Sequence, residues 1–111
     1  MLEKLFGNAV IEKILFYLFV NERCYASKLR AIFAIPLYSV QNALSRLEQG
    51  GVIVRHAEGK TQIYQFNPRY PFLSELKAFL KKAYAFLPEE YRHQFYEIPI
   101  RKRPRRKGKP L

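Results

Sequence analysis

The chain has 111 residues, a formal net charge of +11 and a single cysteine. This length fits one domain, which argues against a two-domain enzyme, and one cysteine excludes an internal disulfide framework. Hydrophobic residues make up 49% and charged residues 26%, as in an ordinary globular chain. The excess of basic residues predicts a polyanionic partner.

The sequence shows neither a membrane span nor a secretory signal. The longest apolar run, Ile14 to Val20, is far shorter than the roughly 18 residues of a spanning helix. Glu3 and Glu12 lie in the first residues, which lack a basic segment and a cleavage site of small residues. We therefore expect a cytoplasmic, nucleoid-associated protein with no membrane partner.

Basic residues are concentrated at the C-terminal end of the chain. Residues 98–111 contain no acid and three prolines, a composition that cannot build a core. The sequence therefore predicts a folded domain over residues 1–97 and a disordered basic tail over residues 98–111. Such a tail could add solubility, serve as a nuclear-type address or contact phosphates, and its cation density favours phosphates. The residues expected to contact phosphates are Arg101, Lys102, Arg103, Arg105, Arg106, Lys107 and Lys109.

Two helices are predicted in the first third of the chain. Asn8 is a good N-cap for a helix over residues 9–22, and Ser27 for a short helix over residues 27–34. In the first helix, Phe16, Phe19 and Val20 fall outside the apolar stripe, so this helix needs either a core wrapped around it or a second subunit. The segment Cys24–Tyr25 between the two helices receives no assignment.

A third helix is predicted over residues 36–49, with Pro36 in the first helical position and an end at Gly50-Gly51. Its apolar residues gather on one side of a helical wheel. Its opposite side is polar but almost uncharged, which suits hydrogen bonding to base edges better than solvation alone. The residues of this polar side are Tyr38, Ser39, Gln41, Asn42, Ser45 and Arg46.

After Gly51 the apolar period changes from that of a helix to that of a strand. Residues 52–56 and 62–66 alternate as two strands of a hairpin around a turn at residues 57–61, where Gly59 supplies a positive φ. A helix follows over residues 72–87 and ends before Pro88, and residues 89–97 add a short last helix.

Residues 39–68 resemble winged helix-turn-helix regulators of the arsenical-resistance and multiple-antibiotic-resistance repressor type. The matching positions are Leu44, Leu47-Glu48, Gly51, Ile53, Gly59, Tyr64 and Asn67-Pro68. The resemblance implies a mainly α fold in which a three-helix core carries a small β-hairpin as its wing. Ala34 and Ile35 depart from it, because many relatives have Gly and a capping Ser or Thr there. The cysteine pair that metal-sensing relatives carry on the recognition helix is also absent.

The resemblance implies sequence-specific binding of double-stranded DNA by a transcriptional regulator. Residues 36–49 would lie in the major groove, while the wing at residues 57–61 and the tail would contact the backbone. Arg46 could grip guanine, and Asn42 or Gln41 could grip adenine. Arg55 and Lys60 on the hairpin are expected to contact phosphates.

A homodimer is expected through the N-terminal helix and the helix over residues 72–87, because both carry surplus apolar residues and two-fold sites need two readers. Cys24, His56 and His93 are too far apart in the sequence to suggest a metal site, and no cofactor or catalytic motif is recognisable. Two alternatives stay open. One is an RNA-binding or ribonucleoprotein accessory module that uses the hairpin and the tail, and the other is a module that binds only protein.

Overall fold

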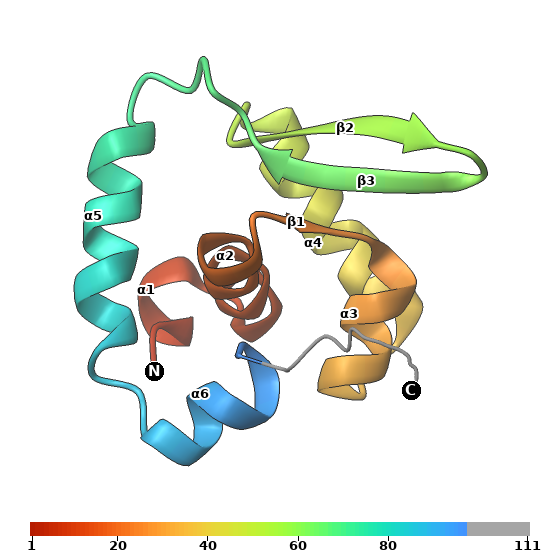
Figure 1. Ribbon diagram of the computed structural model, residues 1–111. Helices are drawn as coiled ribbons and strands as arrows, with labels where there is room; N and C mark the ends of the chain where they lie inside the picture. The colour runs from red at the N-terminus through yellow and green to blue at the C-terminus, as the bar shows by residue number, and fades with distance from the viewer. Residues whose placement is uncertain (98–111) are drawn as a thin grey trace, which may run out of the picture.

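The computed structural model describes residues 1–97, so the predicted tail lies outside the described residues. This part of the chain is mainly helical, with a small antiparallel sheet of three strands (Figure 1). In chain order the elements are α1 (Glu3–Phe6), α2 (Ala9–Asn21), β1 (Arg23–Cys24), α3 (Ala26–Phe33), α4 (Leu37–Gln49), β2 (Ile53–Glu58), β3 (Thr61–Phe66), α5 (Leu73–Tyr84) and α6 (Glu89–Phe95).

The sheet contains the predicted hairpin and one strand that the sequence did not reveal. The strand order is β1-β3-β2, and β1 pairs Arg23 with Gln65 and Cys24 with Tyr64. The predicted turn at residues 57–61 is too long, because Ala57 pairs with Gln62 and Glu58 with Thr61. The chain reverses over Gly59 and Lys60, where Gly59 has a φ of +63°. The hairpin therefore reaches beyond the helices as a paired ribbon (Figure 1).

The helix starts differ in how well the sequence predicted them. The N-cap at Asn8 is confirmed, since its side-chain oxygen accepts hydrogen bonds from the backbone N–H groups of Val10 and Ile11. The N-cap at Ser27 is wrong, because α3 already begins at Ala26 and its cap residue is Tyr25 in an extended conformation. Pro36 stands just before α4 as its cap residue, with a ψ of 143°, rather than in the first helical position.

The predicted helix over residues 72–87 is shorter in the structure, where α5 runs from Leu73 to Tyr84. Its last turn tightens, with the Phe86 N–H donating to the Ala83 carbonyl, and the chain then bends toward Pro88. Pro88 caps α6, so the short last helix is confirmed. This bend places α6 below α2 in the view of Figure 1, and the Asn21 side-chain amide at the end of α2 donates to the carbonyl of Tyr96, the C-cap of α6.

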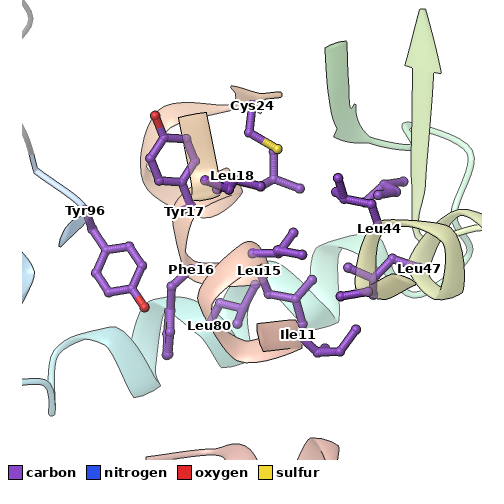
Figure 2. Packing of buried hydrophobic residues seen from close by; sticks show 14 of the residues in the cluster. Ile11, Leu15, Phe16, Tyr17, Leu18, Cys24, Leu44, Leu47, Leu80 and Tyr96 are labelled. Atoms are coloured by element: carbon purple, nitrogen blue, oxygen red, sulfur yellow. The ribbon is translucent and has the colours of Figure 1, made fainter. Parts of the chain in front are cut away.

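Of the two explanations for the surplus apolar residues of the first helix, the structure shows a wrapped core for Phe16, which is therefore not part of a dimer surface. Its side chain is fully buried, and its ring centroid lies 5.7 Å from those of both Tyr84 and Tyr96. Figure 2 shows the rings of Phe16 and Tyr96 next to each other. The surplus apolar surface predicted at this position is therefore covered within the chain. The reason is that α5 and the segment ending in Tyr96 pack against α2 on a side that the other elements leave open, and Phe16 is not available to a partner.

Candidate nucleic-acid interface

The buried and exposed sides of α4 follow the predicted helical wheel. Val40, Ala43, Leu44 and Leu47 are buried, and α4 contacts α2, α3 and β2 through this side. The opposite side is left to solvent because nothing in residues 1–97 packs over it. Of the predicted contact residues, Tyr38, Gln41, Asn42, Ser45 and Arg46 are exposed, and Ser39 is half-buried.

Two of these exposed side chains differ in how free their polar atoms are. The Ser45 hydroxyl accepts a hydrogen bond of 3.3 Å from the Gln49 side-chain amide. Arg46 makes no salt bridge with any carboxylate of residues 1–97, although its backbone carbonyl accepts from the Gly50 N–H. The Arg46 guanidinium therefore keeps its donors available for an external acceptor.

Arg55 is tied to α4. Its Nε lies 3.1 Å from Glu48 Oε2, and both side chains are at least one third exposed. This ion pair connects β2 to the last turn of α4 and fixes the guanidinium beside the helix. Lys60, the second predicted hairpin residue, is exposed in the turn at the hairpin tip.

A second cluster of charged side chains connects the end of β2, next to the hairpin turn, to β1. Glu58 pairs with Arg23 and also accepts from His56 Nε2 at 2.9 Å. The hydrogen bond from His56, followed by that from Arg23, lowers the pKa of the Glu58 carboxyl below its usual value. These side chains are about half exposed, so they orient the hairpin more than they stabilise it.

The charge of the described chain is unevenly divided between its two halves. Residues 23–69, which comprise the sheet, α3 and α4, contain seven basic and two acidic residues. The remaining part of residues 1–97 contains six basic and seven acidic residues. Both acids of the basic half, Glu48 and Glu58, are already paired with arginines. The sheet, α3 and α4 therefore present a net positive surface.

Two basic residues on α3, Lys28 and Arg30, were missed as candidate contact residues. Lys28 is half-buried and Arg30 is exposed, and neither forms a salt bridge with a carboxylate of residues 1–97. The signal was present in the sequence, since the helix that contains them has no acidic residue. The seven basic residues predicted in the tail lie outside the described residues.

The remaining candidate ligands are spread over the molecule. Cys24 of β1 is buried, and desolvation raises the pKa of its thiol to about 12. His56 and His93 are exposed, and Nε2 of His93 on α6 lies 3.8 Å from Glu89 Oε2 and 3.5 Å from Glu97 Oε1. Among residues 1–97, no three His, Cys or Glu side chains come together as metal ligands. No helix in this range has the length and apolar character that crossing a membrane requires.

Comparison with known proteins gives a likeness of fold. No protein-family model and no curated protein matches the chain. The structure is similar to the X-ray crystal structure of the YusO protein from Bacillus subtilis, with a TM-score of 0.57. The two chains are 20% identical, and the match covers 81% of this chain and 70% of that one. At this identity the similarity speaks to the fold alone.

Proposed function

We propose that the chain is a winged helix-turn-helix protein that binds double-stranded DNA in a sequence-specific manner, as a transcriptional regulator. In this interpretation α3 and α4 form the helix-turn-helix, α4 is the recognition helix, and the β2–β3 hairpin is the wing. The order of elements from α2 to β3 and the sheet order β1-β3-β2 support this interpretation. The observation that carries it is the exposed, nearly uncharged polar side of α4 within a basic half of the molecule.

The residues suit a division of labour between base and phosphate contacts. Asn42 and Gln41 offer paired donors and acceptors for adenine, and Arg46 offers the bidentate fork that guanine accepts. Lys28, Arg30, Arg55 and Lys60 lie in the same basic half of the molecule and are cations suited to phosphates. Arg55 would exchange or share its bond with Glu48 on binding, so its contribution to affinity is expected to be smaller than that of Lys60.

The alternative of an RNA-binding module relies on the hairpin rather than on α4. Single-stranded RNA is usually held by aromatic rings that stack on bases. The aromatic residues of β3 suit this role poorly, because Phe66 is buried and Tyr64 is half-buried. We therefore favour duplex DNA.

The proposal is tested by selecting bound fragments from a random duplex DNA library. Affinity for the selected duplex is then compared with random duplex DNA, single-stranded DNA and duplex RNA at one salt concentration. Arg46→Ala or Asn42→Ala should cost about 1 to 3 kcal/mol on the selected duplex and little on random DNA.

Lys81→Ala on α5 is the matched control for Arg46→Ala, because it also removes one exposed cation but lies outside the basic half. It should leave the preference for the selected duplex unchanged. A library without an enriched sequence, or tighter binding to RNA than to any duplex DNA, would overturn the proposal.

A further inference from the structure

A cavity of about 480 Å³ lies beside β1, between the end of α2, the start of α3 and the hairpin. Figure 1 shows these elements around β1. We call it the β1 cavity. Ile63 and Cys24 are buried in its lining, which gives it an apolar part. Its volume lies in the range of small-molecule sites, about 300 to 1,000 Å³. Its lining comes from α2, β1, α3 and the hairpin, so it is separate from the polar side of α4.

Tyr17 brings a polar group to the β1 cavity that no other described residue uses. Its side chain is 6% exposed and lines the cavity. Its hydroxyl makes no hydrogen bond with any group in residues 1–97. Figure 2 shows this hydroxyl pointing away from Phe16 and Leu80. Burial, and then the nearby Cys24 and Tyr25, raise the pKa of Tyr17 above its ordinary value, so the hydroxyl keeps its proton. It is therefore a donor in need of an acceptor.

The first turn of α3 borders the same cavity and lacks the usual groups that neutralise a helix start. Tyr25, its cap residue, makes no side-chain capping bond, and the first turn contains no acidic residue. Tyr25 and Lys28 both line the cavity. The N–H groups of Ala26 and Ser27 donate to no acceptor in residues 1–97. The partial positive charge of this helix start is therefore left open, which favours an anion.

Lys28 adds a full positive charge at a place where the helix dipole disfavours one. It is the third residue of α3 and is half-buried. It makes no salt bridge with any carboxylate of residues 1–97. A lysine in the first turn opposes the dipole of its own helix, so this position costs stability unless an anion lies nearby. Lys28 and the open start of α3 thus favour the same kind of ligand.

The groups around the cavity that would attract a cation are already used within the chain. Glu58 is the carboxylate of the lining, and it pairs with Arg23 and His56. At the end of α2, the Leu18 carbonyl accepts from the Glu22 N–H. The charge that remains uncompensated in the cavity is therefore positive.

We propose that the β1 cavity binds a small phosphomonoester that carries a ring, with the phosphate against Lys28 and the first turn of α3 and the ring beside Ile63. A phosphate is favoured over a carboxylate because its three terminal oxygens can accept from the helix start, from Lys28 and from the Tyr17 hydroxyl together. The guanidinium fork that suits carboxylates is not free, since Arg23 is bound to Glu58. The depth of the Tyr17 hydroxyl favours a small molecule over a phosphate of a DNA backbone.

The experiment is isothermal titration calorimetry of the full chain with phenyl phosphate, without nucleic acid and at a fixed salt concentration. One phenyl phosphate is expected to bind per chain. Benzoate, which has the ring without the phosphate, should bind at least about tenfold more weakly. Inorganic phosphate, which has no ring, should also bind at least about tenfold more weakly, because it leaves the apolar part of the cavity unfilled.

Three variants locate the bound phenyl phosphate. Lys28→Gln should raise its dissociation constant at least about tenfold, and Tyr17→Phe at least about fivefold, because each removes a donor to a charged ligand. Arg30→Gln is the matched control, since it removes an exposed cation of the same helix that does not line the cavity, and it should bind like the wild type. Circular dichroism during thermal unfolding checks that the variants fold. Should Tyr17→Phe fail to fold, Lys28→Gln and Arg30→Gln alone decide the result.

Binding to the basic residues 98–111 would give a different pattern from binding in the cavity. It would show several ligands per chain, no preference for the ring, and full binding in Lys28→Gln. That pattern would overturn the proposal, as would the absence of binding at millimolar phenyl phosphate. Benzoate or inorganic phosphate that binds as tightly as phenyl phosphate would overturn the assignment of a phosphomonoester with a ring. Because no nucleic acid is present, the result does not depend on the proposed function.

Discussion

The Tyr84 hydroxyl donates a 2.6 Å hydrogen bond to Glu97 Oε2 and so joins the end of α5 to the residue that follows α6 and its C-cap. The same segment is held to α2, because the Asn21 side-chain amide donates to the Tyr96 carbonyl at 3.0 Å. The chain is therefore anchored up to Glu97, at the position where the sequence predicts that the folded domain ends.

Two tyrosines in this region should respond differently to loss of their hydroxyl groups. Tyr84→Phe removes the bond to Glu97 and should lower the free energy of unfolding by about 0.5 to 1.5 kcal/mol. The Tyr96 hydroxyl is buried beside the Tyr91 hydroxyl, but it forms no well-aligned hydrogen bond among residues 1–97. Tyr96→Phe should leave the free energy of unfolding unchanged or raise it, because an unsatisfied polar group is removed. Urea unfolding of both variants decides this, and an equal loss in both would contradict it.

The asparagine and serine positions predicted as helix caps offer a second matched pair. Asn8→Ala should destabilise the protein by about 1 kcal/mol, because two N–H groups of α2 lose their acceptor. Ser27→Ala should have almost no effect, because Ser27 lies inside the first turn of α3, where its side chain caps nothing. Thermal unfolding measures both changes. A large loss from Ser27→Ala would show that α3 begins where the sequence suggested.

The features of the fold that could be predicted from the sequence are those that local residue spacing determines. The apolar side of α4, the Asn8 cap and the hairpin each follow from local spacing, and the structure has them. β1 has only two residues, too few to show a period, and its pairing with β3 is a tertiary contact. The sequence does not show that Phe16 is buried within the chain, because Tyr96, one of the residues that cover it, is far away along the chain. Tyr96 also lies in a segment rich in Glu, Arg and His, which does not look like part of a core. The role of the exposed α4 residues depends on a partner that the sequence does not name.

Ala34 should be a site where glycine stabilises the protein. It follows α3 with a φ of +54° and a ψ of 47°, a left-handed conformation that costs a residue with a Cβ about 1 kcal/mol. Ala34→Gly should therefore raise the midpoint of thermal unfolding, even after the entropic cost of glycine. The control is Ala31→Gly in the helical interior of α3, which should lower stability by about 1 kcal/mol. Destabilisation by both variants would contradict the left-handed conformation.

Buried Cys24 predicts a loss of stability at alkaline pH. Burial raises the pKa of its thiol to about 12, whereas an unfolded cysteine ionises near about 8.5. Above about pH 8.5 the unfolded chain loses this proton first, so the free energy of unfolding falls as pH rises toward 12. At neutral pH both states keep the proton and the group has no effect. Urea unfolding between neutral pH and pH 10.5 should show a smaller fall for Cys24→Ala, and an equal fall would show that the thiol is not protected.

Deletion of residues 98–111 should distinguish the contribution of the tail to DNA binding from that of the folded domain. If the tail binds phosphates, its removal should weaken binding to the selected duplex and to random DNA together, because phosphate binding carries no base information. The slope of log K against log salt should shrink by about 0.9 for each phosphate that the tail no longer neutralises, or about 2.7 for three phosphates. Thermal stability should not change, because Tyr96 and Glu97 keep their bonds to Asn21 and Tyr84. An unchanged salt slope would assign the tail to solubility or to another partner, and a drop in the unfolding midpoint would move the domain boundary beyond Glu97.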